Sequence, residues 1–181
     1  MKTLKPFEIA FVGLSNGIHE FSFALGDEFF ACFEGSEITK AALDGKLIMN
    51  KKNNMLDLEF VVKGKVELNC DRCLDSFWDE LDIHKVFYIK FGEKYEEQSD
   101  EVLIIPSTES HIHVAHLFYE FVSLGLPVKR VHPGGESNSC DADTLEQMKK
   151  YLLDKEKNKE NSDKESPTDS RWDALKNLKF N

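Results

Sequence analysis

Residues 56–70 alternate between apolar and polar side chains, and this period of two constrains the fold more than any other stretch. One parity carries apolar side chains at positions 56, 58, 60, 62, 66, 68 and 70, and the other is mostly charged. Because neighbouring side chains of a strand point to opposite faces, the pattern predicts a strand with one buried face. Gly64 lies in phase with the apolar set and predicts a bulge or sharp bend.

Further alternating stretches predict more strands on both sides of this one. Short polar turns separate them, as in β-hairpins, and little helix lies between them. We therefore expect a mainly antiparallel sheet, a meander of hairpins that either stays open or closes like a barrel. The first hairpin is expected to join the first two strands, and Pro106 stops the last. The expected strands are residues 7–12, 18–25, 41–49, 56–70, 77–91 and 102–105.

Two or three helices are expected after the sheet, which makes the fold class α+β. Residues 112–125 are apolar at positions 114, 117, 118, 121 and 124, a helical stripe that would face the sheet. Asp143 and Glu146 form a capping box that predicts the start of a second helix.

The C-terminal region is polar and ends in a short amphipathic stretch. Residues 155–169 contain no apolar residue except Pro167, which predicts a disordered linker. Residues 170–181 predict a helix too short to be stable alone in water, so its apolar side chains need a docking surface. These side chains are Trp172, Leu175 and Leu178. We thus expect one domain over residues 1–154, a linker over 155–169 and a docking helix over 170–181.

The charge balance narrows the class of partner. The chain has 33 acidic and 23 basic residues, a net charge of −10. This argues against non-specific nucleic-acid binding and favours basic partners, such as a ribosomal surface. The longest apolar stretch, residues 117–128, is too short to span a bilayer, and the N-terminus does not resemble a signal peptide. We therefore expect a cytoplasmic protein that does not contact membranes.

Cys70 and Cys73 form a Cys-x-x-Cys turn where the central strand ends. Two thiolates at this spacing can bind one tetrahedral zinc ion. Thioredoxin-like chemistry requires a helix after the pair, whereas a strand is expected here. His132 and Cys140 flank a Pro-Gly-Gly loop and are able to complete a four-ligand site. The alternative is an unmetallated turn in which the cysteines are packing residues.

Other candidate residues have an ordinary structural interpretation. His113, His116 and Glu120 share one face of the expected helix and suit a metal, but the solvent face of an amphipathic helix has the same pattern. Cys32 lies among phenylalanines and is expected in the core. Clustered carboxylates such as residues 96–97 are interpreted as solvated charge. We therefore assign no catalytic residues.

Three motifs that follow one another along the chain resemble the YceD family, the large ribosomal RNA subunit accumulation proteins of bacteria and plastids. The resemblance extends from near residue 40 to the C-terminus, and the Leu-x-Cys-x-Arg-Cys element is its most specific part. The motifs are Leu68-Asn69-Cys70-Asp71-Arg72-Cys73-Leu74, Leu124-Gly125-Leu126-Pro127-Val128 and Arg171-Trp172-Asp173-Ala174-Leu175-Lys176.

This resemblance implies a non-enzymatic ribosome-biogenesis factor, needed for large-subunit rRNA to accumulate, that acts through a ribosomal protein or a pre-ribosomal particle. Many members carry a Cys-rich cluster after the Leu-Pro element, and others place a His and a Cys there. The resemblance thus supports a structural zinc site at Cys70, Cys73, His132 and Cys140, whose four protein ligands leave no open position. The candidate partner-binding residues are Arg72, Lys129, Arg130, Trp172, Leu175 and Leu178.

Two other functions are compatible with the sequence. One is a protein-interaction adaptor with a structural zinc knuckle, which docks a partner through the C-terminal helix. The other is a thiol- or metal-dependent enzyme that uses Cys70, Cys73 and the histidines. Such an enzyme would need an open metal position or a reactive thiol.

Overall fold

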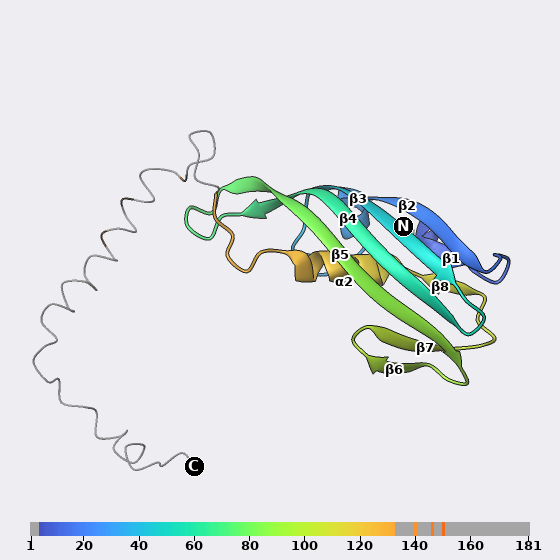
Figure 1. The fold of residues 1–181 in the computed structure, drawn as a ribbon. Helices are drawn as coiled ribbons and strands as arrows, with labels where there is room; N and C mark the ends of the chain where they lie inside the picture. The colour runs from blue at the N-terminus through green and yellow to red at the C-terminus, as the bar shows by residue number, and fades with distance from the viewer. Residues whose placement is uncertain (1–3, 133–139, 141–145, 147–149, 151–181) are drawn as a thin grey trace, which may run out of the picture. The chain divides into compact units, whose positions relative to one another are not determined.

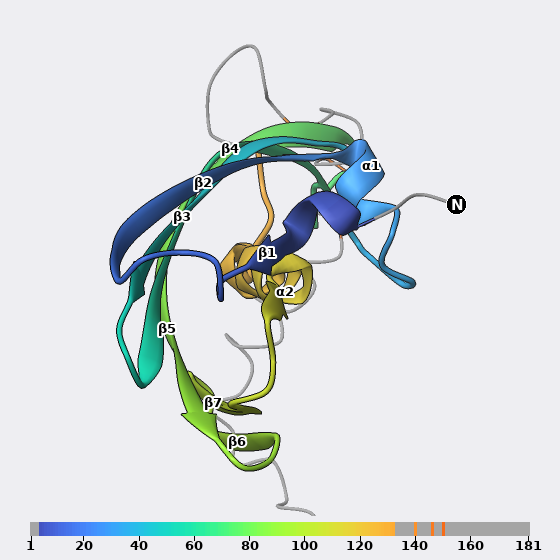
Figure 2. The ribbon, with the colours of Figure 1, turned by 90° about the vertical axis from the view of Figure 1, so that its right-hand side faces the viewer.

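The computed structural model describes residues 4–132, 140, 146 and 150. The chain divides into two compact units, Met1–Val131 and His132–Asn181. The helices and strands named below all lie in the first unit, where a long curved sheet wraps around helix α2 and strand β1 (Figures 1 and 2). The elements in chain order are η1 (Lys5–Phe7), β1 (Glu8–Ala10), β2 (Gly17–Gly26), α1 (Asp27–Phe30), β3 (Ala41–Lys51), β4 (Met55–Asn69), β5 (Ser76–Gly92), β6 (Glu96–Ser99), β7 (Val102–Pro106), β8 (His111–His113) and α2 (Ala115–Gly125).

The main sheet confirms the expected α+β fold and its meander of hairpins. Six strands follow the order β2-β3-β4-β5-β7-β6, and β2, β3, β4 and β5 are antiparallel neighbours. The β4–β5 hairpin pairs Met55 with Lys90 at one end and Asn69 with Ser76 at the other, with the Cys-x-x-Cys turn beyond. Within the described residues the sheet stays open, with β2 and β6 as its edges.

The predicted first hairpin, between residues 7–12 and 18–25, is wrong. β1 instead pairs with β8, where Ile9 lies opposite Ile112, and β2 pairs with β3. The side chains of Phe7 and Phe11, on either side of β1, are 7% and 3% exposed. The N-terminal segment buries these two side chains by crossing the concave face of the sheet. If β1 instead extended the sheet at the edge next to β2, as predicted, Phe7 and Phe11 would be exposed to water.

The last predicted strand is present as β7, but it runs parallel to β5. Ile89 lies opposite Leu103 in this parallel pair. The intervening strand β6 pairs antiparallel with β7 and reverses the chain between β5 and β7. All four residues of β6 are exposed, so it has no apolar alternation from which a strand could be predicted.

The helix predicted over residues 112–125 begins later, because His111–His113 forms β8 and α2 begins at Ala115. Val114, Phe118 and Phe121 are buried as predicted, whereas Leu124 is 79% exposed. The expected helical face of His113, His116 and Glu120, and with it the alternative of a metal site on that face, is therefore wrong, because His113 belongs to a strand.

Aromatic packing attaches α2 to the concave face of the sheet. Phe60 of β4 makes edge contacts with Phe118 and Phe121 at centroid distances of 4.9 and 5.1 Å. Phe118 also contacts Phe23 of β2 edge-on, at 5.3 Å. At the end of α2, a Cβ atom on Gly125 would lie 2.5 Å from Ile83 Cδ1, so the absence of a side chain lets the helix end lie against β5.

Several predictions fall outside the described residues. They concern the second helix that begins near Asp143, the linker over residues 155–169 and the docking helix over residues 170–181. The proposed domain boundaries therefore remain predictions. No helix in the described part of the chain is long and apolar enough to cross a membrane.

Substitution of Gly64 tests the close approach of the β3 and β4 backbones. Gly64 has a φ of 143°, and a Cβ atom there would lie 2.2 Å from the carbonyl oxygen of Ala42. Strand pairing continues across it without a register shift, so it is a point of close backbone approach and not the bulge considered from sequence. We expect Gly64→Ala to lower the free energy of unfolding by about 2–4 kcal/mol in urea titrations.

The matched control for this substitution is Gly13→Ala, because a Cβ atom there meets nothing within 4 Å. Its effect should stay within about 0.5 kcal/mol. Equal effects of the two substitutions would contradict the close approach between β3 and β4.

Candidate metal centre

The turn between β4 and β5 holds Cys70 and Cys73 in a compact hydrogen-bonded loop. The Cys70 N–H donates to the Asp75 carbonyl at 2.9 Å, and the Leu74 N–H donates to the Cys70 carbonyl at 2.9 Å. Leu74 takes a left-handed conformation with a φ of 64°, which closes the turn. The Arg72 N–H is directed at Cys70 Sγ at 3.5 Å, an arrangement that suits a sulfur carrying negative charge.

Burial distinguishes the two cysteines of this turn. Cys70 is fully buried, on the apolar parity of β4 as the sequence predicts, whereas Cys73 is partly exposed. Cys32, by comparison, is partly exposed near α1, and its thiol is directed at the Glu28 carbonyl oxygen. The core position predicted for Cys32 is therefore only partly buried.

A two-way hydrogen bond joins the cysteine turn to the segment that follows α2. The Asp71 N–H donates to the Arg130 carbonyl at 2.7 Å, and the Arg130 N–H donates to Asp71 Oδ2 at 2.7 Å. The Arg130 guanidinium also pairs with Glu37 at 2.7 Å. Since two residues span at most about 7 Å of extended chain, His132 must begin close to the cysteine turn.

His132 and Cys140 form the second pair of potential ligands. His132 Nδ1 lies 3.3 Å from Cys140 Sγ. Such a spacing suits two ligands of one ion, because nitrogen and sulfur ligands of a tetrahedral zinc ion lie about 3.5 Å apart.

Taken together, the four predicted ligands form a cluster that could bind a metal ion. One ligand atom from each of Cys70, Cys73, His132 and Cys140 lies within 4.8 Å of the others. Sulfur ligands of a tetrahedral zinc ion are about 3.8 Å apart, so a small contraction would bring these atoms to bonding positions. Three thiols and one imidazole are also a donor set that zinc prefers.

The structure places the candidate partner-binding residues in different settings. Arg72 and Lys129 are exposed, and neither side chain has a carboxylate partner among residues 4–132, 140, 146 and 150. Arg130 is partly buried and serves the Asp71 and Glu37 contacts. Trp172, Leu175 and Leu178 lie outside the described residues.

Sequence reasoning missed Asp71 and Glu37, which hold Arg130. No periodicity indicates them, since both act through contacts distant in sequence. The position of Asp71 between the two cysteines could have indicated its role, because a carboxylate in a tight turn often accepts a hydrogen bond from a backbone N–H.

Asp71 provides a test of this connection. Asp71→Ala removes the Oδ2 acceptor of the Arg130 N–H, so we expect the free energy of unfolding in urea to fall by about 1 kcal/mol. Asp75→Ala is the matched control, because only the backbone carbonyl of Asp75 is used in the turn. If the two variants unfolded alike, the side-chain bond would have no measurable role.

Comparison with known proteins identifies a family whose sequence pattern includes the cysteine turn. The sequence pattern of one family, described as Large ribosomal RNA subunit accumulation protein YceD, matches residues 58–179. The match covers more than half of the chain and includes most of β4, the cysteine turn, α2 and the segment after it. No curated protein and no solved structure matches the chain. The resemblance noted from the motifs is thus confirmed, and the chain belongs to the YceD family of large ribosomal RNA subunit accumulation proteins.

Proposed function

We propose that the protein is a non-enzymatic ribosome-biogenesis factor of the cytoplasm. It promotes the accumulation of large-subunit rRNA through a ribosomal protein or a pre-ribosomal particle. The family match carries this proposal, because the family is described by its role in large-subunit rRNA accumulation.

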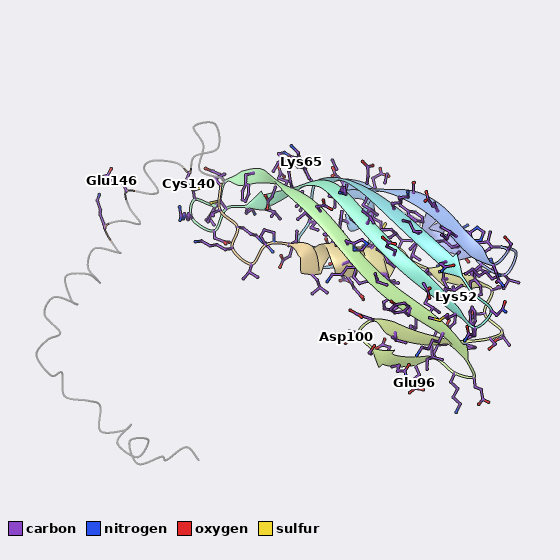
Figure 3. The ribbon with its side chains drawn as sticks, viewed as in Figure 1. Lys52, Lys65, Glu96, Asp100, Cys140 and Glu146 are labelled. Carbon is purple, nitrogen blue, oxygen red and sulfur yellow. The ribbon has the colours of Figure 1, made fainter. Side chains whose placement is uncertain are left out.

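The convex face of the sheet favours a protein partner over direct contact with RNA. Several of its lysines are paired with carboxylates across the strands, including Lys63 with Asp82 at 2.8 Å and Lys65 with Glu80 at 3.1 Å. Figure 3 shows Lys65 on this outer side of the sheet. Binding to RNA phosphates requires cations that release counterions, which lysines already paired with carboxylates do poorly.

The surface around the cysteine turn is the better candidate for partner contact. We define the knuckle surface as Arg72, Leu74, Val128 and Lys129. Leu74 and Val128 are exposed by 77% and 103%, and the two cations are exposed beside them in the sequence. Exposed apolar side chains beside cations are typical of a protein interface.

A structural zinc ion at Cys70, Cys73, His132 and Cys140 would support this surface. Four protein ligands fill a tetrahedral site, so the metal would fasten chain segments and leave no position for a reacting water. The ion would add a covalent-like link to the connection that Asp71 and Arg130 make between the turn and the segment after α2.

Elemental analysis tests the zinc proposal. Tag-free protein purified without chelator should contain about one zinc per chain, as a closed four-ligand site requires. Cys73→Ser should lose this zinc, because it removes a thiolate ligand. Cys32→Ser should keep it, because Cys32 lies outside the cluster. A folded, reduced wild-type protein without zinc would mean that the four residues serve as packing alone.

Affinity capture tests the knuckle surface. Arg72→Glu combined with Lys129→Glu should reduce the ribosomal proteins or pre-ribosomal particles captured by the tagged protein at least tenfold, because rim charges steer and hold the partner. The same double variant should fail to restore the ratio of large- to small-subunit rRNA in cells that lack the protein. Capture should survive ribonuclease if the contact is with protein.

The matched control is Lys85→Glu combined with Lys94→Glu, two exposed lysines remote from the cysteine turn in the chain. This control changes the net charge by the same amount. If both double variants capture the same partners as the wild type, the knuckle surface is not the contact.

A further inference from the structure

The two edges of the main sheet differ in how well they are protected against another strand. β6 forms one edge and has only four residues, all exposed, including Glu96 and Glu97. Its pairing with β7 is interrupted by a register shift between Glu97 and Ser99. Short length, charge and a bulge are the devices by which natural sheets block edge pairing, so β6 is a protected edge.

The opposite edge, β2, is neither short nor interrupted by a bulge, and Glu20 is its one acidic or basic residue apart from His19. Figure 1 shows β2 at the border of the sheet remote from β6. It has ten residues and pairs with β3 over all of them without a register shift. It contains neither proline nor lysine, and no described strand pairs with its other side. An edge of this length offers a row of backbone donors and acceptors to an added strand.

A groove follows this open edge. It has a volume of ≈ 420 Å³ and lies between β2 and the N-terminal segment. Its lining includes Pro6, Glu8, Glu20, Phe21 and Phe23. Phe23 stacks on Phe7 at a centroid distance of 4.9 Å, so the inner part of the groove is aromatic. β1, on its far side, is already paired with β8.

We propose that β2 binds an extended segment of a partner protein as an additional antiparallel or parallel strand. The segment has Lys or Arg at alternate positions and apolar residues between them. Backbone hydrogen bonds to β2 give affinity in this mode of recognition, and alternate side chains give specificity. The apolar residues of the segment face Phe21 and Phe23.

Charge identifies the occupant as basic. The groove lining includes Glu8 and Glu20 and, among the described residues, no lysine or arginine. Glu20 is paired with Lys46 at 2.8 Å and Glu8 lies 3.9 Å from His113, but these pairs are exposed to solvent and therefore weak, so a cation of an added segment can compete for either carboxylate. The whole chain has a net charge of −10, so a second copy would be repelled and a basic segment attracted. The wall formed by Pro6 and β1 also suits a single extended chain better than the edge of another folded sheet.

This inference goes beyond the proposed function, because it concerns a different surface from the knuckle surface and does not need a ribosomal partner. Its test contains no ribosomal component. Failure of one proposal therefore leaves the other standing.

Hydrogen exchange of the full-length protein provides the test. The probe is a nine-residue peptide with blocked ends in which lysine and valine alternate. In the free protein, the β2 amides that point away from β3 should exchange fast. Saturating peptide should slow these amides at least tenfold, because they become hydrogen-bonded in an added strand.

Two controls separate strand pairing from charge attraction. The same peptide N-methylated at alternate residues keeps its charge but loses one row of amide donors, so it should bind about tenfold or more weakly. Glu8→Lys combined with Glu20→Lys should weaken binding of the unmodified peptide by a similar factor. Glu59→Lys combined with Glu80→Lys makes the same charge change on the convex face and should have little effect.

Three outcomes would overturn the proposal. One is protection that appears at β6 or is absent from β2. Another is equal binding of the N-methylated peptide, which would reduce the effect to charge alone. The third is a dimer whose β2 amides are protected without peptide, which would make a second copy the occupant of the edge.

Discussion

The packing of α2 into the concave face of the sheet is the interaction on which the rest of the structure depends. Phe60, at the middle of β4, contacts Phe118 and Phe121 of the helix, and all three are among the buried core residues. Because an open sheet of this length has a large apolar face, it needs a cover to be stable in water. Helix α2 and the ribbon of β1 and β8 provide that cover, and burial of Phe7 joins the ribbon to the same aromatic cluster.

The position of α2 in turn determines where the chain goes next. Gly125 allows the helix end to lie against Ile83 of β5, and Leu126, the residue before Pro127, leaves the helix in an extended conformation. Arg130 then reaches the cysteine turn and exchanges two hydrogen bonds with Asp71. The position of residues 128–130 beside the cysteine turn is therefore a consequence of helix packing, since a shifted α2 would carry these residues away from Asp71.

The sequence was most informative where structure is local. Alternation predicted β3, β4 and β5 closely, because each of these long strands has one buried and one wet face. It failed for β1 and β6: β1 has only three residues and pairs with a strand about a hundred positions away, and β6 is exposed on all sides. The potential metal ligands were predictable from their chemistry, whereas Asp71 was not, because its role is to bond the backbone of a distant residue.

An acidic member of a family described by large-subunit rRNA accumulation poses an electrostatic problem, and the arrangement of charge offers a solution. Carboxylates on neighbouring strands pair with Lys46, Lys63 and Lys65 of the convex face, which lowers the positive charge that this face offers to RNA phosphates. The cations left without carboxylate partners in the described part of the chain include Arg72 and Lys129, beside exposed apolar side chains. At the knuckle surface, positive charge and exposed apolar side chains therefore occur together. Under the proposed function, the ion pairs of the convex face thus favour binding of a protein partner at the knuckle surface.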